Sequence, residues 1–226
     1  MPAPLSIVIP TLNAAEGIGP CIGALVPGVV DGLVRELVIS DGGSGDGIEA
    51  VAEAAGAVLV AGPAGRGGQL RRGAEAARGE WLLFLHADTV LSPDWIGAAR
   101  RHMEAAPDAA GWFRLEFDEG GAAAAWTAGW ANWRSRLFGL PYGDQGLLVR
   151  REVYRAAGGF PDQPLMEDVA LARRLKTREL AAVARSSAER YRRDGWLRRG
   201  WRNLSTLGLW CLGASPDRLA RRYARR

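Results

Sequence analysis

His86-Ala87-Asp88 is the segment of this sequence whose residue types point most directly to chemistry, because it follows the apolar run 81–85 without a break. An aspartate at the end of a buried strand has few structural uses unless it binds something, and its hard oxygen atoms suit Mg²⁺ or Mn²⁺. The alternative is that Asp88 caps a helix that begins at Pro93. We expect Asp88 to hold the metal on a diphosphate, and His86 to contact the metal, the ribose or neither.

Two adjacent carboxylates, Glu167-Asp168, stand at the start of an expected helix over residues 166–176. The positive end of a helix dipole stabilises ionised carboxylates, and an ionised carboxylate can remove the proton from an attacking hydroxyl group. Helix starts also carry acids for propensity alone, and the local sequence leaves both interpretations open. In the catalytic hypothesis Asp168 is the base, and Glu167 is a helper that positions the acceptor or the loop.

A glycine-rich segment, Gly65-Arg66-Gly67-Gly68-Gln69, could clamp phosphate groups through Arg66 and Gln69. Arg71 and Arg72 follow it and could instead only solvate a helix face. Arg66 and Gln69 are therefore the candidates for contact with an anionic ligand.

The second half of the chain offers candidates for a further pocket. Asp144 and Gln145 could line it, and Trp112 could stack on the face of a sugar. Three more tryptophans could stack on a sugar in the same way, and a buried core is the more typical place for all four; the three are Trp126, Trp130 and Trp133.

These side chains need a scaffold, and the first half of the chain has the pattern of one. Short apolar runs at 5–10, 36–40, 58–60 and 81–85 alternate with alanine-rich helical stretches. This alternation predicts an α/β domain with a mostly parallel central sheet flanked by helices. Polar residues follow the strand ends or lie in the loops beyond them: Thr11, Asn13, Asp41, Arg66, His86 and Asp88. Ligands of such sheets bind at this carboxyl edge.

After Pro107 the sequence becomes rich in tryptophan and mixed in character. Further strands are expected over residues 112–117 and 146–149, with helices over 120–138 and 166–176. Up to residue 203 the sequence resembles the family-2 glycosyltransferases, which have the GT-A fold. The motifs that carry the resemblance are SIVIPTLN at 6–13, VISDGGSGDG at 38–47, FLHAD at 84–88, and GGFP at 158–161 followed by MED at 166–168.

The resemblance implies an inverting glycosyltransferase that moves a sugar from a nucleotide diphosphate sugar, a UDP-sugar, to an acceptor hydroxyl with the help of Mg²⁺ or Mn²⁺. Asp168 and Glu167 become the catalytic carboxylates, Asp88 the metal ligand, and Asp144, Gln145 and Trp112 the acceptor side. The donor side that we expect comprises Pro10, Thr11, Asn13, Glu16, Asp41, Arg66, Gln69, His86, Ala87 and Asp88.

Two residues depart from the family pattern. His86 stands where many relatives have the first aspartate of a metal-binding Asp-x-Asp, and Gly42 stands where many have a second aspartate in the nucleoside motif. The segment 65–69, the His86 form and the run YGDQG at 142–146 resemble a bacterial subgroup associated with arsenosugar biosynthesis.

The change in composition along the chain divides it into a glycosyltransferase domain, residues 1–184, and a basic tail, residues 185–226. The domain has a donor-binding half, 1–106, and an acceptor half, 107–184. The tail is helical and carries twelve arginines and three acids, whereas the whole chain has a net charge of +4. It is suited to anionic membrane or to folding back on the donor phosphates.

The sequence of 226 residues shows neither a secretory signal nor an apolar run of the length that spans a membrane, and its two cysteines lie far apart. We expect a cytoplasmic protein, held peripherally at the inner face of the membrane. A lipid-linked acceptor and a homodimer stay open, and nucleic acid is not an expected partner. The alternative functions are a sugar nucleotidyltransferase and a nucleotide-sugar-binding module without turnover.

Overall fold

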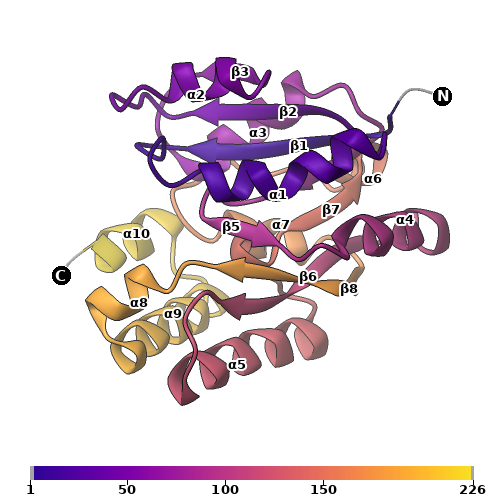
Figure 1. Cartoon of the computed structure of the whole chain (residues 1–226). Coiled ribbons are helices and arrows are strands. Elements are labelled where there is room, and N and C mark those ends of the chain that lie inside the picture. The colour runs from indigo at the N-terminus through magenta and orange to yellow at the C-terminus, as the bar shows by residue number, and fades with distance from the viewer. Residues whose placement is uncertain (1–2, 225–226) are drawn as a thin grey trace.

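The computed structural model describes residues 3–224, which form one eight-stranded sheet and the helices around it (Figure 1). The strands are β1 (Leu5–Thr11), β2 (Val34–Asp41), β3 (Val58–Ala61), β4 (Trp81–Phe84), β5 (Thr89–Leu91), β6 (Ala110–Phe117), β7 (Leu147–Arg150) and β8 (Thr177–Ser186). The helices are α1 (Gly19–Val30), α2 (Ile48–Ala54), α3 (Arg66–Ala76), α4 (Trp95–Ala105), α5 (Ala122–Phe138), α6 (Arg151–Ala156), α7 (Glu167–Ala172), α8 (Glu189–Asp194), α9 (Trp196–Cys211) and α10 (Pro216–Ala224), with a 3₁₀ turn, η1, at Gly143–Gln145.

The strand order is β3-β2-β1-β4-β7-β6-β8-β5. The first four strands of the chain run parallel to one another, and β6 pairs in parallel with β8. β7 is antiparallel to β4 and β6, and β5 is antiparallel to β8. The predicted α/β fold, a mostly parallel sheet flanked by helices, is confirmed.

Alternation along the strands buries both faces of this sheet. In β1, Ile7 and Ile9 point into one core, and Val8 points into the other. Helices α1, α2 and α4 cover the first face, and α3, α6 and α7 cover the second. Strands that are buried on both faces consist of continuous apolar residues, which is why the N-terminal strands can be predicted from the sequence.

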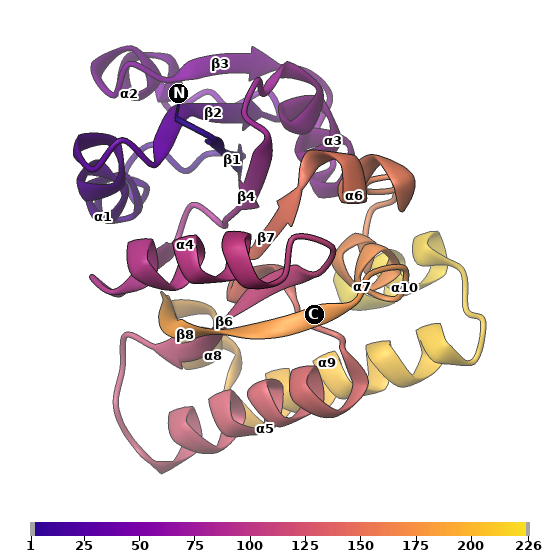
Figure 2. The ribbon, with the colours of Figure 1, turned by 90° about the vertical axis from the view of Figure 1, so that its right-hand side faces the viewer.

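The central strand β1 lies between β2 and β4, so the direction in which strands are added reverses at β1 (Figure 2). Loops that leave the carboxyl ends of two such strands diverge, and a crevice opens between them. Thr11 ends β1, and the His86-Ala87-Asp88 segment follows β4. The fold therefore brings these two segments to one edge.

The predicted domain boundary at residue 184 is wrong because it falls inside β8. Ala184 pairs with Leu91 of β5 and with Leu115 of β6. The strand is rich in alanine and charged residues, whose strand propensity is low, and pairing with neighbours on both sides compensates for it.

The chain beyond β8 also belongs to the folded unit. Tyr191 and Trp196 pack their rings against Phe117, with centroid distances of 5.0 and 5.1 Å. Leu219 of α10 is buried in a cluster with Met166 and Val169. Among residues 3–224, no helix is both long and apolar enough to cross a membrane.

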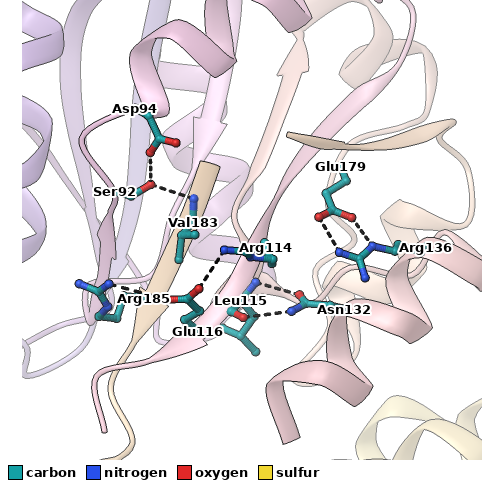
Figure 3. A network of polar contacts seen from close by, with 10 residues as sticks. All are labelled: Ser92, Asp94, Arg114, Leu115, Glu116, Asn132, Arg136, Glu179, Val183 and Arg185. Atoms are coloured by element: carbon teal, nitrogen blue, oxygen red, sulfur yellow. Dashed lines mark hydrogen bonds and ion pairs between the residues drawn. The ribbon is translucent and has the colours of Figure 1, made fainter. Parts of the chain in front are cut away.

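Helix α5 packs on β6 through small residues, among them Ala124, Ala128 and Ala131. Asn132 donates to the carbonyl oxygen of Leu115 at 3.0 Å and accepts from its amide at 2.8 Å, which fixes the helix on the strand (Figure 3). The expectation that the α5 tryptophans form a core is wrong, because they lie on the opposite side of the helix; Trp126, Trp130 and Trp133 are exposed.

The contact between α3 and β1 yields a prediction. A Cβ atom on Gly73 would lie 2.4 Å from Val8 Cγ1, so α3 can approach β1 only with glycine there. Gly73→Ala should lower the free energy of unfolding by about 1–3 kcal/mol, measured by urea denaturation. Gly23→Ala in α1, where no atom lies within 4 Å, is the control and should stabilise by about 0.5–1 kcal/mol. Equal shifts for both would contradict the close approach.

Candidate active site

A cleft of about 400 Å³ opens at the carboxyl ends of β1 and β4. Its volume lies within the range of small-molecule sites, roughly 300–1,000 Å³. Eight of the residues predicted for the donor side line it: Pro10, Thr11, Asn13, Arg66, Gln69, His86, Ala87 and Asp88. Glu16 lines an adjoining cavity that Asn13 and Asp88 share.

The loops after β1 and β2 are joined by hydrogen bonds along one wall of this cleft. The amide of Asn13 donates to Ser44 Oγ at 2.8 Å, and the amide of Gly45 donates to Asn13 Oδ1 at 3.1 Å. The amide of Ala15 donates to Asp46 Oδ2 at 2.7 Å. Asn13 adopts a positive φ of 51°, a conformation that asparagine tolerates better than most residues.

Asp41 builds this loop and does not line the cleft. Its side chain accepts hydrogen bonds from the hydroxyls of Thr11 and Ser44 and from the amides of Gly43 and Ser44. Burial raises the pKa of Asp41, but these hydrogen bonds outweigh burial, so the pKa lies below its usual value. With four hydrogen bonds to this loop, Asp41 positions the loop in this structure, and its contact with the nucleoside stays a prediction.

Gln69 fixes the ends of β1 and β2 from helix α3. Its Nε2 atom donates to the carbonyl oxygens of Thr11 at 2.6 Å and of Ser40 at 3.0 Å. A Cβ atom on Gly42 would lie 3.1 Å from the Gln69 amide group. The glycine that departs from the family pattern therefore makes room for Gln69, whose buried amide stabilises the floor of the cleft.

Asp88 borders three adjoining cavities and is not a helix cap. Helix α4 begins at Trp95, and Asp94 occupies its N-cap position. The alternative interpretation of Asp88 is thus wrong. Within residues 3–224, no three His, Cys, Asp or Glu side chains come together as a ready-made metal site.

Asp168 faces a cavity of about 160 Å³ that also contains Asp88, His86 and Asp144. Its Oδ2 atom accepts a hydrogen bond from the amide of Gly143 at 2.9 Å, and Oδ1 accepts from the amide of Val169 at 2.7 Å. These two amides fix the carboxylate at the start of α7 while it stays accessible from the cavity.

Glu167 points away from the cavity and into the protein. Its side chain is 1% exposed and forms an ion pair with Arg66. Burial raises the pKa of Glu167, the positive charge of Arg66 opposes this, and the nearby Asp168 adds to it. Because Glu167 is enclosed, its role is to hold Arg66 at the cleft, and Asp168 remains the candidate base.

His86 lies against the backbone of η1. A Cβ atom on Gly143 would be 2.3 Å from His86 Nε2, so only glycine permits this contact. Burial and the nearby positive charge of Arg66 lower the pKa of His86 to about 3. The imidazole is therefore neutral at physiological pH and links the end of β4 to the turn that holds Asp168.

The three residues predicted for the acceptor side lie in different environments. Asp144 lines the Asp168 cavity, as expected for a pocket residue. Gln145 is fully buried and accepts a hydrogen bond from Ser135 Oγ at 2.7 Å, so it supports η1 from behind. Trp112 is 1% exposed in β6 and has no free ring face for a sugar. Gln145 is thus a structural residue, contrary to the prediction, and Trp112 occupies the core position that was the alternative to sugar stacking.

Sequence reasoning missed a set of pocket residues on the last three helices. Those that line the Asp168 cavity are Arg190, Tyr191, Arg199, Asn203, Thr206 and Tyr223. The mixture of arginines and aromatic residues in the tail was the available signal. The structure favours the fold-back interpretation for this part of the tail, since Arg190 also lines the donor cleft.

Fold and site together define an α/β protein with a polar ligand cleft at the carboxyl edge of its sheet. A family model described as "Glycosyl transferase family 2" matches residues 6–144, more than half of the chain. The chain belongs to glycosyl transferase family 2.

Curated relatives match a shorter stretch. The glucosyl-3-phosphoglycerate synthase of Mycolicibacterium paratuberculosis is 37% identical over 95 residues, which is 38% of this chain and 29% of the relative. The enzyme of the same name from Mycolicibacterium smegmatis is 35% identical over 99 residues, 40% of this chain and 32% of the relative. The matched stretch thus covers about a third of the length of these relatives.

Solved structures share the fold over most of the chain. S. aureus TarS 1–349 in complex with UDP-GlcNAc superimposes with a TM-score of 0.59 at 14% identity, covering 81% of this chain and 58% of TarS. The M. tuberculosis glucosyl-3-phosphoglycerate synthase, in complex with Mn²⁺, UDP and phosphoglyceric acid, gives 0.55 at 22% identity, covering 81% of this chain and 69% of that one. At these identities the similarity establishes the fold.

Asp144 provides a prediction for this site in the metal-free protein. Burial raises its pKa from 3.8 to about 6, opposed by Arg134. Because the folded state holds this proton more tightly than the unfolded chain, the stability that protonation gives is present below about pH 4 and is lost as the pH rises through about 6. Asp144→Asn should raise the free energy of unfolding near neutral pH by up to about 3 kcal/mol and change it little near pH 4.

Urea denaturation at the two pH values measures this difference. Glu53→Gln replaces an exposed carboxylate of α2 and is the control, with the same small effect at both pH values. A stability gain of Asp144→Asn that does not depend on pH would show that burial does not shift this carboxyl group.

Proposed function

We propose that the chain is a glycosyltransferase that moves a sugar from a UDP-sugar to an acceptor hydroxyl with inversion. The observation that carries the proposal is the meeting of the donor cleft with the Asp168 cavity, since Arg66, His86, Asp88 and Arg190 line both. A donor in the cleft and an acceptor in the cavity would come together at these shared residues. The relatives crystallised with UDP-GlcNAc or with UDP and Mn²⁺ support the choice of donor.

Asp88 fits the role of ligand to Mg²⁺ or Mn²⁺. Its carboxylate borders the cleft, and no cap or ion pair of the described residues engages it. Mg²⁺ is commonly held by one or two protein carboxylates together with substrate phosphates, so a single aspartate suffices when the ligand is a diphosphate. The metal would supply positive charge to the departing nucleotide diphosphate. Arg66 and Arg190 would add fixed positive charge at the same cleft.

The chemical step assigned to the protein is proton removal. Asp168 takes the proton of the acceptor hydroxyl, whose oxygen attacks the anomeric carbon as the bond to the nucleotide diphosphate breaks. The hydrogen bonds from Gly143 and Val169 keep the carboxylate oriented. Glu167 acts on this step indirectly, because it holds Arg66 beside Asp168.

The acceptor is a hydroxyl compound that fits among the rings of the Asp168 cavity, which are Phe117, Tyr142, Tyr191 and Tyr223. A lipid-linked hydroxyl compound is one such acceptor. The resemblance to the arsenosugar-associated subgroup stays a proposal based on the residues 65–69, His86 and 142–146. Product analysis separates transfer from activation of a sugar: free UDP supports a glycosyltransferase, pyrophosphate a nucleotidyltransferase, and nucleotide binding without either product a module without turnover.

The role of Asp88 can be tested by the stability that bound ligand adds to the protein. UDP with Mn²⁺ should stabilise the wild-type protein by about 2.7 kcal/mol at a concentration a hundredfold above Kd. Asp88→Ala should abolish this stabilisation, because the bridge between protein and diphosphate is lost. Asp94→Asn, in an exposed carboxylate at the start of α4, is the control and should retain it. Unchanged Mn²⁺-linked stabilisation in Asp88→Ala would remove Asp88 from the metal role.

Conservative substitutions separate the roles of the two adjacent carboxylates, Glu167 and Asp168. Asp168→Asn should reduce turnover by about 10²–10⁴ with nearly unchanged affinity for UDP, since only proton transfer is lost. Glu167→Gln should leave residual turnover above that of Asp168→Asn and should weaken UDP binding through Arg66. Inactive Glu167→Gln beside active Asp168→Asn would reverse the two roles.

A further inference from the structure

Helices α5 and α9 expose large apolar side chains in two stripes. On α5 the stripe is Trp126, Trp130, Trp133 and Leu137, at the i, i+4, i+7, i+11 spacing of one helix face, and Phe138 follows it. On α9 it is Leu197, Trp201 and Leu204, again at i, i+4, i+7. Trp126 is 66% exposed, Trp201 70% and Leu197 82%. We call these eight side chains the aromatic face.

The two stripes form one surface. Helices α5 and α9 lie side by side at the end of the molecule opposite α1 to α3 (Figure 2). Trp130 and Leu204 line the same small cavity between the helices. The Trp130 and Trp133 rings stack at a centroid distance of 4.9 Å, and Phe138 meets Trp133 edge-on at 5.7 Å. Exposed apolar patches of this kind mark contact with a partner or a membrane.

Helix α5 cannot rotate to bury these tryptophans against the sheet. Asn132 holds α5 to the Leu115 backbone, and Arg136 forms an ion pair with Glu179 of β8 (Figure 3). The inward side of α5 is filled by alanines against β6. Because both sides of the helix are fixed, turning the aromatic residues inward would require rebuilding this layer.

The charge around the aromatic face identifies its partner. Neither α5 nor α9 contains an aspartate or a glutamate. Of their five arginines, Arg134 is buried, and three form ion pairs with acids of other elements: Arg136, Arg199 and Arg202. Arg198 is exposed beside Leu197, and Arg192 and Arg193 of the preceding α8 are exposed as well. From 189 to 224 there are nine arginines and three acids. Exposed tryptophans beside a stretch with a surplus of arginine over acid are the composition that favours the interface of an anionic bilayer.

We propose that the aromatic face docks this protein on the interface of an anionic membrane. Trp126, Trp133 and Trp201 enter the headgroup region, and Arg198 with the α8 arginines contacts lipid phosphates. Docking itself is independent of sugar transfer.

The aromatic face lies next to the Asp168 cavity, so docking would also orient that cavity toward the membrane. This consequence rests on the proposed function. The cavity under Trp130 and Leu204 is also lined by Tyr142, Asp144 and Tyr191, and the same three residues line the Asp168 cavity. The acceptor end of the site therefore lies directly behind the membrane-facing layer, so an acceptor held in the bilayer would approach Asp168 from this side.

Vesicle binding of the full chain tests the proposal without any nucleotide present. The wild-type protein should co-sediment with vesicles that contain phosphatidylglycerol and less with pure phosphatidylcholine, and high salt should remove only part of the binding. Brominated phosphatidylglycerol should quench its tryptophan fluorescence. The triple variant Trp126→Ser, Trp133→Ser, Trp201→Ser should lose about tenfold or more in partitioning, since binding scales with the apolar area inserted.

Matched variants decide between this face and other surfaces. Val26→Ser, Val29→Ser, Val30→Ser removes exposed apolar residues from α1 and should bind vesicles like the wild type. Arg218→Gln, Arg221→Gln, Arg222→Gln in α10 should lose less than the tryptophan variant. Loss of binding in the α10 variant with normal binding in the tryptophan variant would overturn the proposal, as would wild-type protein that fails to bind.

A second copy of the chain is the competing partner for the aromatic face. A stable dimer that the tryptophan substitutions dissociate, with no vesicle binding by either form, would overturn membrane docking. Thermal unfolding of each variant checks its fold. Binding of UDP and Mn²⁺ in solution should be equal in all of them; its absence from the wild type would overturn the proposed function and leave the vesicle result intact.

Discussion

The ion pair between Arg66 and Glu167 joins the two halves of the site across 101 residues of sequence. An enclosed carboxylate without a cationic partner is costly, so α7 is driven to place Glu167 against the start of α3. Arg66 thereby reaches the cleft at the carboxyl ends of β1 and β4, and the next residue of α7, Asp168, lines the adjoining cavity. One pairing thus sets both the cation of the cleft and the direction of the candidate base.

Close backbone approaches support this pairing. A Cβ atom on Gly67 would lie 2.3 Å from the carbonyl oxygen of Pro161, so α3 can touch the segment before α7 only with glycine at that position. Met166 directly precedes the carboxylates with a positive φ of 64°, which is unusual for a residue with a side chain. Its side chain is nevertheless buried with Leu219 of α10. The backbone turn that begins α7, just before Glu167 and Asp168, is therefore held by packing against the C-terminal helix α10.

The same helices explain why the site and the surface of the protein are connected. α8 and α9 bring Arg190, Tyr191 and Asn203 to the acceptor cavity, while Leu197, Trp201 and Leu204 of α9 stay outside. Helix α9 is amphipathic: its inner side lines a polar pocket, and part of its outer side is apolar. Helix α9 therefore lines the cavity with Asn203 and exposes Trp201 on its outer side.

The sequence by itself determined the parallel half of the sheet and the donor cleft. Strands buried on both faces are continuous apolar runs, and the residues that follow them reach a common edge because parallel strands end on the same side. Thr11, Asn13, Arg66 and Asp88 could be placed for this local reason. The local pattern also marked Glu167 and Asp168 as a pair.

Only the tertiary structure decided how those two carboxylates differ, because their exposure depends on Arg66, far away in the sequence. The tertiary structure also shows that Gln145 and Trp112 are buried and that the α5 tryptophans are exposed. For α5 the reason is that helical spacing shows which residues share a face, but not which face packs on the sheet. β8 escaped prediction because many of its residues have low strand propensity, and its pairing with β5 and β6 joins segments far apart in the sequence.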